Sequence, residues 1–143
     1  MVIFTGLDDV ENLKSTTFPN GEMTDIWLEE ANQTAEGDFN QLDVRLRGGL
    51  SNKQITVSFN PISITHWLKK KFFDHSKLLS GLSQDTYVYS EDDIDGKRVK
   101  LFCTILHTTY KDNMFLGDAE KLLLESYKDT DPYYYEVYCL GHW

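Results

Sequence analysis

Short apolar runs alternate with amphipathic stretches along the chain, and this pattern predicts alternating strands and helices. Strands are expected at residues 2–7, 23–28 and 54–59, where apolar residues cluster between turn signals. Helices are expected at residues 36–46, 65–73, 118–126 and 133–138, where apolar residues recur at helical spacing. Thr34 is expected to cap the first helix. The alternation favours an α/β fold with a mainly parallel sheet flanked by helices.

Two further strand-like segments, at residues 86–89 and 99–107, flank an acidic tract at residues 91–96. The tract ends in Asp95-Gly96, a dipeptide that favours the tight turn of a β-hairpin. These segments are therefore expected to pair with each other.

The composition is that of one domain, residues 1–143, with enough apolar residues to bury a core, at 41% apolar and 13% aromatic. No apolar run reaches the length of a membrane span and no signal-peptide pattern opens the chain, so we expect a cytoplasmic protein with no membrane contact. The net charge of −9 argues against indiscriminate nucleic-acid binding. The basic runs at residues 69–71 and 97–100 are most simply solvated surfaces.

The strongest candidate chemistry lies where the apolar run Ile26-Trp27-Leu28 ends in the adjacent carboxylates Glu29-Glu30. A buried parallel strand delivers acidic groups in this way to the rim of an α/β sheet. In nucleotide hydrolases one such acid holds Mg²⁺ through water, and the next orients or deprotonates the attacking water. The simpler alternative is a solvated start of a loop. No G-x-x-x-x-G-K-[ST] phosphate-binding loop occurs in the chain.

A second candidate is the strand end Ser58-Phe59-Asn60-Pro61. If this strand lies beside the one that carries the glutamates, Ser58 and Asn60 can bond to the attacking water or to a phosphate. An ordinary turn between Asn60 and Pro61 is the alternative. Trp27 and Trp67 are expected in a core or an inter-domain face.

Several segments occur in an order that resembles the ATPase region of the phage terminase large subunit, of the PBSX-like type. They are Phe4 to Asp8, Ile26 to Ala31, Arg45 to Gly48, Val57 to Pro61, His66 to Asp74, Thr108 to Leu116 and Tyr138 to Trp143. The resemblance implies a partial P-loop NTPase fold of the ASCE, RecA-like type. It runs nearly from end to end of the chain.

The resemblance also implies roles for individual residues. Glu29 and Glu30 match the Walker B pair, with Glu29 holding Mg²⁺ through water, where the family usually has Asp, and Glu30 positioning the attacking water. Ser58 and Asn60 match the coupling motif, which links hydrolysis to movement. Arg47, like Arg45, can contact phosphate or act as an arginine finger, or simply sit favourably at a helix C-terminus.

The resemblance covers the part of the ATPase domain from Walker B to the inter-domain linker, without the Walker A lysine or the nuclease domain. The complete protein would use ATP and Mg²⁺ to move viral DNA into a procapsid, with the terminase small subunit and the portal as partners. We expect the chain alone to be inactive, to hold no nucleotide, and to self-associate through exposed sheet edges. It would act in the cytoplasm of the bacterial host.

Two other functions stay open. One is a non-enzymatic interaction module, a prophage remnant that binds other terminase subunits. The other is a different hydrolase that uses the carboxylates with a metal, although the sequence lacks further well-spaced Asp and His ligands. The segment Thr108 to Asn113 is either a second nucleotide-sensing or domain-contact loop or a simple capped turn.

Overall fold

A computed structural model describes residues 2–6, 21–46, 52–74, 76 and 83–143. The chain divides into two compact units, Met1–Phe59 and Asn60–Trp143, which are described separately. Within the described residues the fold is mixed α/β, with two small sheets and several short helices.

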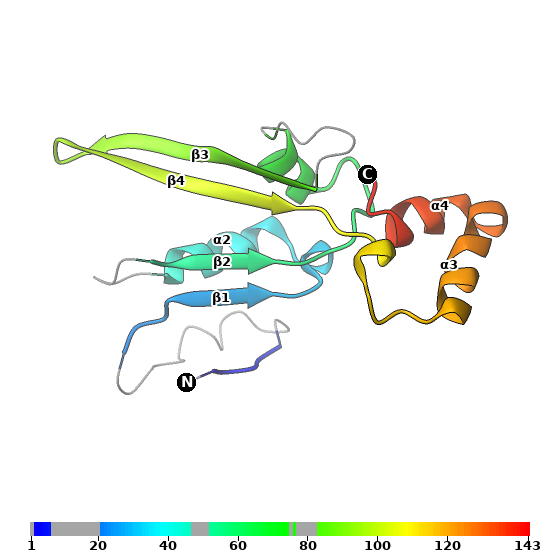
Figure 1. The fold of residues 1–143 in the computed structure, drawn as a ribbon. Helices are drawn as coiled ribbons and strands as arrows, with labels where there is room; N and C mark the ends of the chain where they lie inside the picture. The colour runs from blue at the N-terminus through cyan, green and yellow to red at the C-terminus, as the bar shows by residue number, and fades with distance from the viewer. Residues whose placement is uncertain (1, 7–20, 47–51, 75, 77–82) are drawn as a thin grey trace. The chain divides into compact units, whose positions relative to one another are not determined.

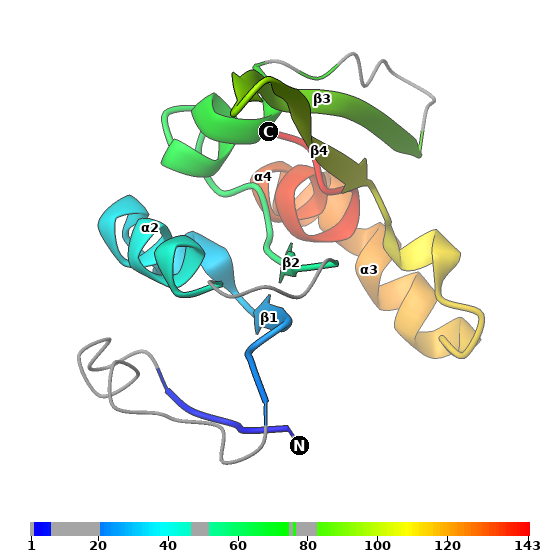
Figure 2. The ribbon, with the colours of Figure 1, turned by 90° about the vertical axis from the view of Figure 1, so that its left-hand side faces the viewer.

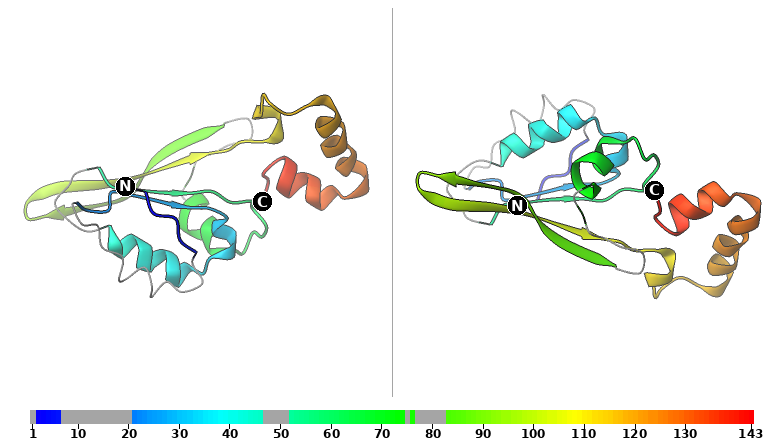
Figure 3. Two further views of the ribbon diagram at one scale, coloured as in Figure 1. Left: turned by 90° about the horizontal axis from the view of Figure 1, so that it is seen from below. Right: turned by 90° about the horizontal axis from the view of Figure 1, so that it is seen from above.

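The first unit is built on two parallel strands, β1 (Asp25–Leu28) and β2 (Gln54–Val57), which lie side by side in Figure 1. Helix α2 (Glu36–Arg45) connects them and runs along one side of the pair in Figure 2 and Figure 3. Phe39 and Leu42, three residues apart on α2, are buried, as is Leu28 at the end of β1. Burial of each such side chain contributes about 1.5–3 kcal/mol to folding.

Two details of this unit differ from the sequence-based expectations. Residues 2–6, expected as a strand, form none; the side chains of Val2 and Phe4 are 78% and 93% exposed, and a strand needs a pairing partner to be stable. The N-cap of α2 is Ala35 rather than Thr34, and no side chain caps it.

The second unit contains the hairpin of β3 (Gln84–Ile94) and β4 (Lys97–Leu106), the pair of long arrows in Figure 1. The expected turn at Asp95-Gly96 is confirmed, and both residues have a positive φ, of 50° and 75°. A two-residue turn of this hand matches the twist of antiparallel strands. The expectation of a mainly parallel sheet is therefore wrong for this half of the chain, because parallel pairing among the described residues is confined to β1 and β2.

Helices fill the rest of the second unit. They are η2 (Lys69–Phe73), η3 (Tyr110–Asp112), α3 (Asp118–Thr130), α4 (Pro132–Tyr134) and η4 (Tyr135–Cys139), with a further 3-10 turn, η1 (Ala31–Gln33), in the first unit. The expected helices at 65–73, 118–126 and 133–138 are thus confirmed, with shifted bounds. In the described part of the chain, no helix is long and apolar enough to cross a bilayer.

The end of the chain ties this second unit together. The ring Nε2 of His107, just after β4, donates to the carbonyl of Leu140 at 2.7 Å. The ring of Trp143 meets that of Phe73 edge-on, with centroids 5.2 Å apart. Tyr87 on β3 donates its hydroxyl to the carbonyl of Phe72. These contacts join the hairpin, η2 and the C-terminal residues into one body.

Candidate functional site

The candidate carboxylates follow β1 directly. Leu28, the last residue of the strand, is 5% exposed, whereas Glu29 and Glu30 are exposed, and Ala31 is fully buried. The two glutamates therefore lie between two buried residues, Leu28 and Ala31. The burial of these neighbours holds the backbone of the glutamates at the end of the strand pair. This is the placement that the apolar run followed by two acids predicted.

Ser58, just after the neighbouring strand, makes backbone hydrogen bonds to the residues on both sides of these glutamates. Its amide donates to the carbonyl of Leu28 at 3.0 Å, and its carbonyl accepts from the amide of Ala31 at 3.0 Å. The parallel register pairs Leu28 with Val57, so Ser58 is the first residue beyond both strand ends. The expectation that Ser58 lies beside the Glu29-Glu30 segment is confirmed.

The backbone of Glu30 is left-handed, with φ 51° and ψ 44°. A residue with a Cβ pays about 1–3 kcal/mol for such a conformation, and strain of this kind concentrates at functional sites. The turn is closed by the amide of Gln33, which donates to the carbonyl of Glu30 at 2.9 Å.

Gln33 also contacts the side chain of Glu30, because its Nε2 donates to Glu30 Oε2 at 2.6 Å. Gln33 is not among the residues that the sequence motifs indicate. The only signal for it was its position three residues after Glu30, a spacing that places two side chains together once the segment turns helically.

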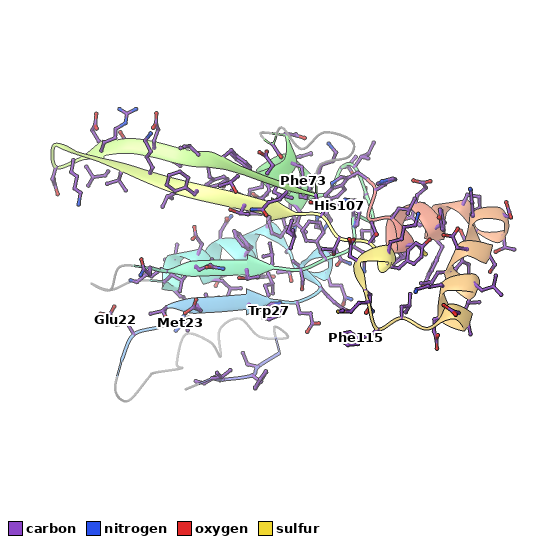
Figure 4. All side chains as sticks on the ribbon, viewed as in Figure 1. Glu22, Met23, Trp27, Phe73, His107 and Phe115 are labelled. Atoms are coloured by element: carbon purple, nitrogen blue, oxygen red, sulfur yellow. The ribbon has the colours of Figure 1, made fainter. Side chains whose placement is uncertain are left out.

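Trp27 adds a side-chain link between the strands. Its indole Nε1 donates to Ser58 Oγ at 3.4 Å, and the residue, labelled at β1 in Figure 4, is 74% exposed. Of the two places expected for Trp27, the core is wrong, because side chains alternate between the two faces of a strand and its neighbour Leu28 takes the buried face. An inter-domain face stays a prediction for Trp27.

The other predicted site residues lie in other parts of the fold or outside the described residues. Asn60 is the first residue of the second unit, where its carbonyl accepts from the amide of Ile62 at 2.9 Å. Arg47 lies outside the described residues. Arg45 occupies the last turn of α2, a favourable place for a cation.

Glu29 and Glu30 are the residues of this site that could contribute ligands to a metal ion. Among the described residues, no group of three or more His, Cys, Asp and Glu side chains could hold a metal ion. Mg²⁺ typically takes one or two carboxylates, keeps several waters and binds substrate phosphates. The exposed carboxylates of Glu29 and Glu30 fit that pattern.

Two other candidate regions have ordinary structural roles. Asp112 accepts from the amide of Thr109 at 2.7 Å, a hydrogen bond that holds the pKa of this carboxyl below its usual range. Thr109 Oγ1 accepts in turn from the amide of Lys111, so the capped turn expected in this segment is formed.

The basic run on β4 is paired within the hairpin. Arg98 bonds to Glu91 at 2.6 Å and lies 3.5 Å from Asp93, while Lys100 lies 3.4 Å from Glu91. These opposite charges across the two strands give Arg98, Lys100, Glu91 and Asp93 a role in the pairing of the hairpin.

Comparison with known proteins identifies the family. The profile described as phage terminase large subunit matches residues 1–142. The PBSX phage terminase large subunit of Bacillus subtilis (strain 168) is 26% identical over 136 residues, which cover 95% of this chain and 30% of that relative. The chain thus spans about a third of the length of this relative, and no solved structure matches it. With a match over nearly its whole length, the chain belongs to the phage terminase large subunit family.

Proposed function

We propose that this chain supplies the Walker B and coupling segments of the ATPase in a viral DNA-packaging motor. The observation that carries the proposal is the parallel pairing of β1 with β2, which brings Glu29, Glu30 and Ser58 to one edge. The carboxyl ends of neighbouring parallel strands are where nucleotides bind in P-loop and other open α/β folds.

In this proposal the two carboxylates divide the work. Glu30 accepts a hydrogen bond from the attacking water and orients it toward the γ-phosphate of ATP. Glu29 holds Mg²⁺ through its water shell, and the ion when bound neutralises charge on the phosphate oxygens. Ser58 and Asn60 bond to the water or the γ-phosphate, and Arg47 contacts phosphate.

Ser58 also suggests how hydrolysis is coupled to movement. Its backbone bonds to Leu28 and Ala31 lie on either side of the glutamates. A displacement of the end of β2 would therefore shift the backbone that carries Glu30. DNA, the terminase small subunit and the portal are the partners we propose for the complete motor, and pairing of copies through sheet edges remains a prediction.

The phosphate-binding lysine has to come from a sequence outside these 143 residues. We therefore expect the chain alone to bind ATP-Mg²⁺ weakly or not at all, because the P-loop amides and lysine supply much of that affinity. Calorimetry is the measurement. Micromolar affinity of the isolated chain would contradict this assignment of roles.

The decisive experiment combines the chain with the terminase region that carries a P-loop and measures DNA-stimulated ATPase activity. Glu30→Gln should abolish turnover and leave nucleotide binding largely intact. Glu36→Gln removes a carboxylate from α2 of the same unit and serves as the matched control. Full turnover with Glu30→Gln would overturn the proposal, and an equal loss of nucleotide binding would make Glu30 structural. A combination that never hydrolyses ATP would favour the interaction module.

A further inference from the structure

The carboxylate of Glu30 is held on one side by a neighbouring amide. Gln33 Nε2 donates to the carboxyl oxygen Oε2 of Glu30 at 2.6 Å, which is short for a hydrogen bond from nitrogen to oxygen. Two backbone hydrogen bonds hold the turn from Glu30 to Gln33. The amide of Ala31 donates to the carbonyl of Ser58, and the amide of Gln33 donates to the carbonyl of Glu30.

The turn itself does not need the Gln33 side chain. Backbone bonds close it, from Gln33 to Glu30 at 2.9 Å and from Thr34 to Ala31 at 3.1 Å. Both Gln33 and Glu30 are exposed, and a hydrogen bond between exposed side chains contributes little to stability because water competes for both partners. In the structure, the side-chain bond is made by one oxygen of the Glu30 carboxylate, Oε2, and the carboxylate is seen in the orientation that makes it.

We propose that Gln33 is a positioning residue for Glu30, an inference that rests on the proposed role of Glu30 in hydrolysis. The amide occupies Oε2, which leaves Oε1 to accept from the attacking water. It also limits rotation of a carboxylate that would otherwise sample several rotamers in solvent. Correct placement of a general base within hydrogen-bond reach of its proton is what gives such a group its catalytic effect.

The contact can be tested on the 143-residue chain without any activity. In an NMR spectrum, Glu30→Ala should shift the side-chain amide signal of Gln33 strongly. The side-chain amide of Gln41, exposed on α2 in the same unit, serves as the internal control and should shift little. Equal small shifts of the two amides would overturn the contact.

The role is tested in the assembly that hydrolyses ATP. Gln33→Ala should lower kcat about tenfold and leave the KM for ATP unchanged, because only the orientation of the base is lost. Gln33→Glu, of the same size but without a donor, should lower kcat at least as much, and Gln33→Lys, which keeps a donor, should restore part of it. Gln41→Ala is the matched control.

Comparison of the two single substitutions separates this inference from the proposed function. If Glu30→Gln keeps full turnover, the proposed function fails. If Glu30→Gln abolishes turnover while Gln33→Ala leaves kcat unchanged or raises it, Gln33 does not position the base and this inference alone fails.

Discussion

The left-handed backbone of Glu30 provides a sharp physical test of the site. At φ 51° and ψ 44°, a residue with a Cβ costs about 1 kcal/mol or more, whereas glycine adopts this conformation freely. Glu30→Gly and Glu30→Ala both remove the carboxylate and its bond to Gln33. The difference between their free energies of unfolding therefore reports the cost of the backbone conformation alone. We expect Glu30→Gly to be the more stable by about 1 kcal/mol, roughly a fivefold difference in the unfolding equilibrium constant.

The neighbouring residue is the control. Among the described residues, the positive-φ positions other than glycine are Glu30, Asn52 and Asp95, so Glu29 is not in the left-handed region. Glu29→Gly should therefore be less stable than Glu29→Ala by about 0.5–1 kcal/mol, because glycine loses more chain entropy on folding. The sign of the glycine effect should reverse between two adjacent residues.

Native-state hydrogen exchange provides the measurement. The amides of Ala31 and Ser58 are bonded across the two strands, so their protection reports opening of this unit. A glycine effect of the same sign at Glu29 and Glu30 would refute the reasoning. The expected result would mean that the native sequence keeps a carboxylate where glycine is more stable, a cost that natural proteins accept at functional sites.

Three further predictions concern stability at other positions of the two units. Gly96→Ala should destabilise the hairpin by about 1 kcal/mol in urea denaturation, because the residue has φ +75° although there is open space around the new Cβ. Gly37→Ala, also in open space but within helix α2, should instead stabilise the protein by about 0.5–1 kcal/mol. Gly141→Ala should lower the melting temperature more than Gly96→Ala does, because it adds a Cβ 2.9 Å from an imidazole nitrogen to the strain of φ +64°. The hydrogen bond from Arg98 holds the pKa of Glu91 below its usual range. The small stabilisation that this exposed pair gives the hairpin should be lost as the pH falls through that lowered pKa, and Arg98→Ala should reduce this pH dependence of amide protection in an NMR titration.

The sequence alone determines those features of this protein that depend on residues close together in the chain. The helix at α2 follows from apolar residues at helical spacing, and the hairpin turn follows from Asp95-Gly96, since both depend on residues close together in the chain. The two glutamates after an apolar strand could be identified for the same reason. The strand expected at residues 2–7 is not formed at residues 2–6, the described part of it, because a strand also requires a partner, which the local pattern does not provide.

Long-range pairing decided the candidate site. The register of β1 against β2 brings Ser58 beside residues that precede it by about thirty positions, and no local preference specifies that alignment. The left-handed backbone of Glu30 and the bond from Gln33 follow from it, because the bond between Ala31 and Ser58 fixes the turn that contains them. The sequence by itself determined which acids stand at the end of the strand, and the tertiary structure determined what surrounds them.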